Sequence, residues 1–351
     1  MYVESLKKLL EKNGHKVILY TKNSKNIKTL WDKIKVGFNL FWNTTVAREL
    51  NELIQKEVPD VVHFNNIYPL IGATAYLICK KNRVKVIQTI HNYRFMCPKG
   101  ILYREGGVCE LCISKRFFSP AIQFGCYHGS RAASFLYSFA FFIHKNMGTF
   151  TSINTYIFPS LFTQQYYQRY FGISGSRSIY LPHFVDLQVS KKKIEKENWY
   201  LYVGRLSEEK GILQLLEVFK NLPKFTLKVI GEGPQHREVN IYRKYKNIHI
   251  LGHVQRVKLV PYYQKARALI VPSLFYEIGP LVSYEATALN TPIIIAATSS
   301  NDEDIKISLK KKLLEYNDKN NSYPKNRVKI STPEEYIKVI TRIYSQYTRE
   351  K

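Results

Sequence analysis

The sequence predicts an α/β protein with two doubly wound domains of parallel sheet. Three observations carry this prediction. Short apolar, β-branched runs alternate with amphipathic segments of helical length. The alternation is interrupted once, by a lysine-rich stretch at 190–197, and 351 residues at roughly 150 per domain suffice for two domains. Ligands of such sheets bind at the carboxyl ends of the strands, so functional residues are expected there, facing the cleft between the domains.

In the first half, an amphipathic helix over 2–13 ends at Asn13-Gly14 and leads into a short strand, His15–Tyr20. The strands expected after it lie at 60–65, 84–89, 153–159 and 178–181, with helices near 68–81 and 160–170. In the second half, strands are expected at 199–203, 226–230, 248–251, 268–271 and 293–296, and helices at 211–220, 234–244, 257–265, 280–289 and 333–347. The prediction is an N-terminal domain over 1–190 and a C-terminal domain over 191–351 with a closing C-terminal helix.

The composition limits the function classes. Fifty-three Lys and Arg against 27 Asp and Glu give a net charge of +26, and the stretch 61–185 contains only two acids, Glu105 and Glu110. Such a field attracts polyanions, namely nucleic acid, anionic lipid or phosphorylated ligands, and the alternative is a proteome that uses lysine as its default surface residue. A hydrophobic fraction of 45% excludes a disordered or fibrous chain. Without an apolar run of membrane-spanning length or a signal-peptide pattern, we expect a soluble protein of a reducing compartment.

The cysteines and one aromatic segment leave alternatives open. Cys97, Cys109, Cys112 and Cys126 have the spacing C-x11-C-x2-C-x13-C, which suits a structural zinc site or, alternatively, free buried thiols, whereas Cys79 is expected in a helix core. Residues 131–145 carry five aromatics between basic ends, too few apolar residues to span a bilayer. This segment is expected either to lie in a membrane interface or to pack as a buried helix on the first domain.

The segment EIGPLVSYEA follows an apolar strand and opens a helix. Pro280 suits the first helical position, and the amides of Leu281 and Val282 then form an anion site at the helix start. Glu277 precedes this helix and Glu285 lies within it, so both carboxylates can border one cavity. The alternative is an ordinary strand–loop–helix unit with surface glutamates.

This segment resembles the glutamate-pair signature of glycosyltransferase family 4, whose members have the GT-B fold with two Rossmann-like domains. Further segments resemble motifs of the family and occur in the family's order: PDVVHFN at 59–65, TIHNY at 89–93, LPHFVD at 181–186, YVGRLSEEKG at 202–211 and IGEGP at 230–234. A cysteine-containing insertion at about 94–130 resembles one found on the acceptor side in a subset of the family. The resemblance runs from residue 2 to about 296.

The resemblance implies a role for each matching residue. Family members bind a nucleotide-sugar, and Arg205 and Lys210 correspond to the residues that neutralise its diphosphate. Basic side chains at a helix start are disfavoured unless an anion is present, which favours the same role. Glu277 and His91 correspond to the catalytic residues at the transferred sugar, and Glu285 corresponds to the ribose ligand. The donor-binding set implied is Gly204, Arg205, Lys210, Gly279, Leu281, Val282 and Glu285.

The function implied is a retaining hexosyl transfer, through an oxocarbenium-like transition state and without a required metal or other cofactor. The acceptor would be a saccharide or a lipid-linked saccharide in polysaccharide, capsule or lipopolysaccharide synthesis. The basic first domain would bind the anionic inner face of the cytoplasmic membrane, with the protein otherwise cytoplasmic. Alternatives are a relic that binds nucleotide-sugar or a partner without turnover, and a basic zinc-ribbon protein that binds nucleic acid, against which Arg205, Lys210 and the glutamates argue.

The sequence departs from the family pattern in two places. The family's first strand and glycine loop have no counterpart before the helix at 2–13, so we expect either further chain upstream or an exposed sheet edge in the first domain. No glycine occurs after Gly279, where the family has further glycine turns.

Overall fold

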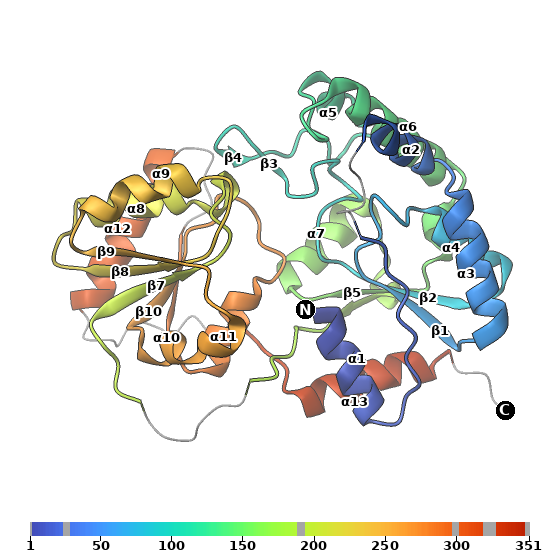
Figure 1. Ribbon diagram of the computed structural model, residues 1–351. Coiled ribbons are helices and arrows are strands. Elements are labelled where there is room, and N and C mark those ends of the chain that lie inside the picture. Colours follow the sequence, from blue (N-terminus) through green and yellow to red (C-terminus); the bar gives the residue numbers. More distant parts are fainter. Residues whose placement is uncertain (1, 24–28, 188–193, 297–301, 319–327, 348–351) are drawn as a thin grey trace. The chain divides into compact units, whose positions relative to one another are not determined.

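The computed structural model describes residues 2–23, 29–187, 194–296, 302–318 and 328–347 (Figure 1). The chain divides into two compact units, each described by itself below. Unit 1 comprises Met1–Ile101, Glu110–Pro182 and Pro333–Lys351, and unit 2 comprises Leu102–Cys109 and His183–Thr332. This division differs from the expected one in three places: it falls at 182/183 instead of 190/191, it assigns 102–109 to unit 2, and it assigns the last helix to unit 1.

Unit 1 is built on a parallel sheet with the strand order β1-β2-β5-β6. Its strands are β1 (Val61–Phe64), β2 (Lys85–Thr89), β5 (Thr155–Phe158) and β6 (Ser178–Tyr180). The α-helices described in this unit are α1 (Tyr2–Lys12), α2 (Leu30–Asn39), α3 (Thr44–Glu57), α4 (Thr74–Lys81), α5 (Ser119–Gln123), α6 (Arg131–Asn146), α7 (Leu161–Phe171) and α13 (Pro333–Ser345). Helices α2, α3 and α5 were not predicted from the sequence, and α4 begins six residues later than expected.

The predicted strand His15–Tyr20 is wrong. Residues 15–23 form no strand in the described chain, and β1, which would have to be its neighbour, is an edge strand that pairs only with β2. A cavity of about 940 Å³ is lined by Val17–Lys22 on one side and by β1 on the other. Strands pair only when they lie about 4.8 Å apart, so a segment separated from the sheet by a cavity stays unpaired.

Helix α13 belongs to unit 1 because its tyrosines bond to that unit. The Tyr344 hydroxyl lies 2.7 Å from Nδ1 of His63, a residue of β1. In Figure 1 one end of α13 lies near β1. The Tyr347 hydroxyl, just beyond the helix, lies 2.7 Å from Oγ1 of Thr155. The hydroxyls of Tyr336 and Tyr2 are also hydrogen-bonded, so α1 and α13 are joined. The prediction of a last helix that closes on the first domain agrees with these bonds.

Unit 2 contains a five-stranded parallel sheet with the order β11-β10-β7-β8-β9. The strands are β7 (Trp199–Val203), β8 (Thr226–Ile230), β9 (Ile248–Gly252), β10 (Ala268–Val271) and β11 (Ile293–Ile295), each within a residue or two of its prediction. The α-helices are α8 (Ile212–Lys220), α9 (His236–Asn240), α10 (Val260–Lys265), α11 (Leu281–Ala288) and α12 (Asp302–Asp318). A two-stranded hairpin, β3 (Tyr103–Arg104) and β4 (Gly107–Val108), and helix α12 were not predicted.

Two predicted helices of unit 2 are shorter than expected. The helix expected at 234–244 is α9 followed by a 3-10 turn, Ile241–Lys244, and the helix expected at 257–265 is a 3-10 turn, Arg256–Lys258, followed by α10. Short 3-10 turns at helix ends are common because their tighter geometry satisfies the terminal backbone groups. The fold class is confirmed: α/β, with two doubly wound parallel sheets.

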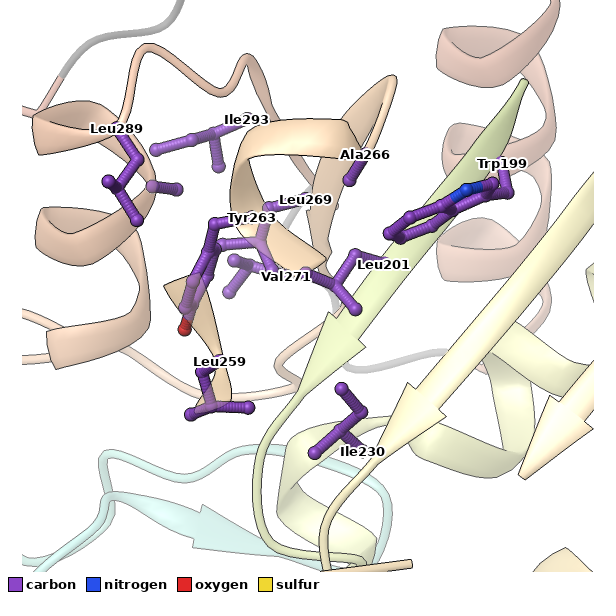
Figure 2. Close-up of a cluster of buried hydrophobic side chains, with 11 residues drawn as sticks. Trp199, Leu201, Ile230, Leu259, Tyr263, Ala266, Leu269, Val271, Leu289 and Ile293 are labelled. Carbon is purple, nitrogen blue, oxygen red and sulfur yellow. The ribbon is translucent and has the colours of Figure 1, made fainter. Parts of the chain in front are cut away.

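A hydrophobic cluster supports the functional end of the unit 2 sheet (Figure 2). Leu201, Leu269 and Val271 from strands β7 and β10 pack against Leu289, which follows α11, and the ring of Tyr263 from α10. Figure 2 shows the Tyr263 ring within this cluster and its hydroxyl at the cluster's margin. The hydrophobic cluster therefore fixes the position of the Tyr263 hydroxyl at its margin.

Candidate functional site: the carboxyl edge of the unit 2 sheet

Three loops meet at the carboxyl ends of β7, β8 and β10, where parallel sheets bind ligands. The loop after β7 is bonded to the loop after β8, because the Gly204 amide donates to the Ile230 carbonyl over 3.0 Å and the Leu206 amide donates to the Glu232 carbonyl over 2.9 Å. These bonds fix the backbone that carries Arg205. The Arg205 side chain is exposed, and no hydrogen-bond partner is recorded for it among the described residues.

Glycine is required where these two loops touch. Gly231 has φ +144°, and a Cβ there would lie 1.8 Å from the Gly204 carbonyl oxygen. A Cβ at Gly233 would lie 2.2 Å from the Leu206 carbonyl oxygen. Only glycine allows this close backbone approach. The glycine turn predicted at 230–234 therefore has a physical reason.

The loop after β7 is also bonded to the loop after β10. The Leu274 amide donates to the Glu209 carbonyl over 2.9 Å, and Gly211, at φ +67°, lies so close that a Cβ would approach the Pro272 oxygen to 2.1 Å. This junction brings Lys210 to Glu277, 67 residues later: Nζ donates to Oε1 over 2.6 Å. Ser273 Oγ donates to the same oxygen over 2.5 Å. Lys210 and Glu277 thus form one ion pair, which the sequence did not predict.

Helix α11 begins at the same edge. Gly279 has φ +120°, and Pro280 is the residue before the helix (φ −66°, ψ 121°) instead of its first residue. The Pro280 carbonyl accepts from the amides of Ser283 and Tyr284. The described chain provides no recorded acceptor for the amides of Leu281 and Val282, so these two donors are available at the positive end of the helix dipole. This arrangement is the one that the sequence predicted for an anion.

Glu285 lies one turn further into α11 and is buried, with 5% exposure. One carboxylate oxygen accepts from Arg256 Nε over 3.0 Å, and the other accepts from the Tyr263 hydroxyl over 2.8 Å. Burial, together with the charge of Glu285, raises the pKa of Tyr263 well above its usual value, so Tyr263 stays a donor. Each carboxylate oxygen has a second lone pair, so Glu285 can accept one further hydroxyl.

Sequence reasoning missed Arg256, Tyr263 and Ser273. One signal was available for Arg256: it follows the carboxyl end of β9 just as Arg205 follows that of β7. Tyr263 lies in a helix among other apolar residues and carried no signal. All the predicted donor-binding residues, and Glu277 with them, lie on the loops and the helix at the carboxyl edge of the unit 2 sheet.

His91 belongs to unit 1 and follows the carboxyl end of β2. Its Nε2 lies 2.8 Å from Oδ1 of Asn65, which follows β1, and its ring contacts the Tyr2 ring edge-on at 5.2 Å. Burial lowers the pKa of His91 to about 4, so the imidazole is neutral at neutral pH. His91 and Asn65 also line the 940 Å³ cavity beside β1. A neutral, oriented imidazole can donate or accept a hydrogen bond to a hydroxyl.

Four cysteines, Cys97, Cys109, Cys112 and Cys126, have a spacing that suits either a structural zinc site or free buried thiols. Within the described residues, which include all four, no group of three or more His, Cys, Asp or Glu is placed to hold a metal ion. Cys97 and Cys112 are buried thiols, and Cys109 and Cys126 are partly exposed. Cys79 is fully buried in α4 as predicted, and burial raises its pKa to about 12.

Helix α6 contains the aromatic segment 131–145. Tyr137, Ala140 and Phe141 are buried in unit 1, whereas Phe135 and Phe139 are exposed. The helix therefore packs on the domain with one face and leaves aromatic rings on the other. In the described chain, no helix has both the length and the apolar character needed to cross a bilayer.

Two family models match the chain. The model for "Glycosyltransferase Family 4" matches residues 1–189, more than half of the chain, and the model for "Glycosyl transferases group 1" matches residues 186–321. The chain belongs to glycosyltransferase family 4, and its fold is of the GT-B class.

Individual relatives are distant. An uncharacterized 42.6 kDa protein in the cps region of Klebsiella pneumoniae is 23% identical over 263 residues, which is 73% of this chain and 61% of that protein. The chain thus spans about three fifths of the length of this relative. Sucrose-phosphate synthase from Thermosynechococcus elongatus has a TM-score of 0.57 at 15% identity, covering 98% of this chain and 92% of that one. HepE from Anabaena, solved with UDP and glucose, has a TM-score of 0.55 at 13% identity, covering 97% and 84%.

Proposed function

We propose that this protein transfers a hexosyl group, with retention of configuration, from a nucleoside-diphosphate sugar to a saccharide or lipid-linked saccharide acceptor in cell-surface polysaccharide synthesis. The observation that carries the proposal is the edge of the unit 2 sheet, where two cations, two helix-start amides and a buried carboxylate lie together. The solved relative with UDP and glucose and the relative from a cps region support the same substrate class.

The diphosphate would bind Arg205, Lys210 and the amides of Leu281 and Val282. Charge-assisted donors stabilise the diphosphate most as its charge grows during departure, so they contribute to the rate as well as to binding. Lys210 now pairs with Glu277 at 2.6 Å. A bound diphosphate would compete for this ammonium and release part of the Glu277 carboxylate for the hydroxyls of the transferred sugar.

Glu285 would accept from a ribose hydroxyl. Arg256 and Tyr263 hold its two oxygens in place, so the ribose meets an oriented acceptor and pays little ordering entropy. His91 would bind the transferred sugar from unit 1. Because cations and amides neutralise the diphosphate, no divalent metal or other cofactor is needed, and we expect transfer to persist in EDTA. Loss of activity in EDTA, restored by Mg²⁺, would contradict this part.

We propose that unit 1, which would bind the acceptor, binds the inner face of the cytoplasmic membrane. The stretch 61–185 holds 13 Lys and Arg against two acids, and all but its last few residues lie in unit 1 or the hairpin segment. Each cation near an anionic leaflet contributes on the order of 1 kcal/mol. A lipid-linked saccharide would present its sugar at such a surface.

A second candidate is a protein that binds nucleotide-sugar without turnover. The open edge of β1 and the cavity beside it favour this candidate, because His91 lines the same cavity. Catalysis demands positioning to within about 1 Å, and a unit 1 with an unfilled cavity provides less support for His91. The experiment below separates the two candidates.

The test compares Glu277→Gln with Glu285→Gln, using Glu238→Gln on the exposed face of α9 as the control. UDP, GDP and ADP affinities are measured by calorimetry, and donor hydrolysis or transfer is measured with UDP-glucose and GDP-mannose. Glu285→Gln should weaken binding of the preferred nucleotide about tenfold or more, since a charge-assisted hydrogen bond contributes roughly 1.5–3 kcal/mol. Glu277→Gln should lower turnover about 100-fold without weakening nucleotide binding, because Lys210 is then free for the diphosphate.

Several outcomes decide between the candidates. Nucleotide binding without turnover by the unsubstituted protein with any donor would favour the binding protein. Equal effects of the two glutamate substitutions on nucleotide affinity would contradict the separate roles. Absence of nucleotide binding altogether would overturn both candidates.

A further inference from the structure

Helix α2 packs on unit 1, but its apolar stripe faces solvent. It packs on α6 through Gly37, where a Cβ would lie 3.2 Å from Leu136 Cδ1, and Leu40 after the helix is 2% exposed. A different face of the helix carries Trp31, 79% exposed, and Phe38, 65% exposed. Residues spaced i, i+3, i+7 share one helix face, and a globular helix normally buries the apolar one.

The helix is held in this orientation by specific bonds. Thr29 and Asp32 form a capping box, in which Thr29 Oγ1 accepts from the Asp32 amide over 3.1 Å and Asp32 accepts from the Thr29 amide over 2.8 Å. At the other end, Nε2 of the buried His144 lies 3.2 Å from the Leu40 carbonyl oxygen. The apolar stripe therefore faces solvent in a well-anchored helix.

The exposed rings of α6 extend this stripe. Phe135 (46% exposed) and Phe139 (40% exposed) stack at 5.7 Å, and the Phe139 ring meets the Phe41 ring at 5.8 Å, directly before Trp42. Figure 1 shows α2 and α6 at the same end of unit 1. We call Trp31, Phe38, Trp42, Phe135 and Phe139 the aromatic face. Exposed apolar groups clustered in this way mark a binding surface.

We propose that the aromatic face inserts into the interface of an anionic lipid bilayer. Trp and Phe rings sit favourably at headgroup depth when cations flank them. Lys35 on α2 and Arg131 at the start of α6 are exposed beside the rings. Helix α6 contains no acid, and the one acid of α2, Asp32, is occupied in the capping box.

A second copy of the chain fits this surface less well. Two copies related by a twofold axis would bring the same cations together, and like charges at an interface cost binding free energy. Phosphate headgroups provide the opposite charge over the whole face. The aromatic face would be the surface through which unit 1 binds the membrane. This role rests on the proposed membrane binding and does not depend on the transfer reaction.

The chain contains its own probes for the test. Trp31 and Trp42 are two of its three tryptophans, and the third, Trp199, is 5% exposed in the core of unit 2. Vesicles of equal parts phosphatidylcholine and phosphatidylglycerol should shift tryptophan emission to the blue, and brominated phosphatidylcholine in these vesicles should quench it. Vesicles of phosphatidylcholine alone should act weakly, and salt should reduce the effect of the anionic vesicles. Unchanged emission with anionic vesicles at low salt would overturn the proposal.

Substitutions in the aromatic face test whether vesicles bind there. Trp31→Ser with Phe38→Ser should lower the vesicle partition coefficient by about tenfold or more, since burying even one large apolar side chain contributes on that scale. The matched control is Ile241→Ser with Val257→Ser, two residues of unit 2 that are 60% and 80% exposed. Lys35→Gln and Arg131→Gln should each lower binding to anionic vesicles by about fivefold.

Two readouts keep the inference separate from folding and from transfer. All four residues of the serine variants are exposed, so melting temperatures should be unchanged, and protection by UDP should persist in every variant. If sedimentation shows self-association that Trp31→Ser with Phe38→Ser abolishes, while vesicle binding is unaffected, the face is a dimer surface and the proposal is wrong. Equal vesicle binding by the two serine variants would contradict it as well.

Discussion

Units 1 and 2 both have a parallel sheet, but they differ in how their charged and apolar groups are partnered. At the functional edge of unit 2, Lys210 is paired with Glu277 and Arg256 with Glu285, and the loops are joined by backbone hydrogen bonds. In unit 1, cations outnumber acids, β1 has an open edge, and tryptophan and phenylalanine rings face solvent. The charged groups at this edge of unit 2 are therefore held by partners from distant segments, whereas unit 1 leaves large aromatic side chains exposed.

The largest effect is expected where the backbone of unit 2 is most constrained. Gly231→Ala should destabilise unit 2 by more than about 4 kcal/mol, because the new Cβ would lie 1.8 Å from the Gly204 oxygen and neither backbone can move freely. Gly252→Ala in unit 2 and Gly14→Ala in unit 1 also have positive φ, but no atom lies within 4 Å of their Cβ. These two should cost only about 1–2 kcal/mol. Urea unfolding of the three variants measures the difference, and a small cost for Gly231→Ala would mean that the loops are not rigid.

The next effect concerns ligand binding at the same edge. Saturation with a nucleoside diphosphate at 100 times its Kd stabilises a protein by about 2.7 kcal/mol. Arg205→Ala with Lys210→Ala should remove nearly all of this stabilisation in thermal unfolding with UDP, GDP and ADP. The charge-matched control is Lys224→Ala with Lys246→Ala, two exposed lysines that precede β8 and β9 and so lie at the amino edge of the sheet. Protection that survives the first double substitution would show that the diphosphate binds elsewhere.

A smaller effect is expected in unit 1, on the pH dependence of the free energy of unfolding. Burial lowers the pKa of His91 from 6.5 to about 4, so below pH 6.5 the unfolded chain binds a proton that the folded chain does not. Stability should therefore fall as the pH falls from 6.5 toward 4, by about 2 kcal/mol between pH 7 and pH 5 for this residue. His91→Gln should remove that part of the pH dependence, whereas His249→Gln, at an exposed position of β9, should not. Burial and, to a smaller extent, the neighbouring His91 lower the pKa of His63 to about 3, so the part of its contribution that is due to burial remains in both variants. An unchanged pH slope in His91→Gln would show that His91 is protonated in the folded protein.

Local patterns in the sequence determined most of the architecture. The apolar runs predicted nine strands within a few residues, and the glycines at 231 and 233 marked a loop where a Cβ does not fit. The helix start at 280–282 and the glutamates on either side were likewise readable, because strand, turn and helix signals depend on residues close together in the chain. The same signals placed the candidate donor residues at strand ends.

Only the tertiary structure decided which groups meet. The partners of Glu285 are 22 and 29 residues away, Glu277 and Lys210 are 67 apart, and His63 and Tyr344 are 281 apart. Residues 15–20 have the pattern of a strand but form none in the described chain, and no group of three or more cysteines, histidines or acids among the described residues is placed to hold a metal ion. Helix α2 was not predicted from the sequence, and the direction of its apolar stripe follows from the packing of Gly37 beside Leu136. Periodicity fixes what a segment can bury, whereas the packing of distant segments fixes what it does bury.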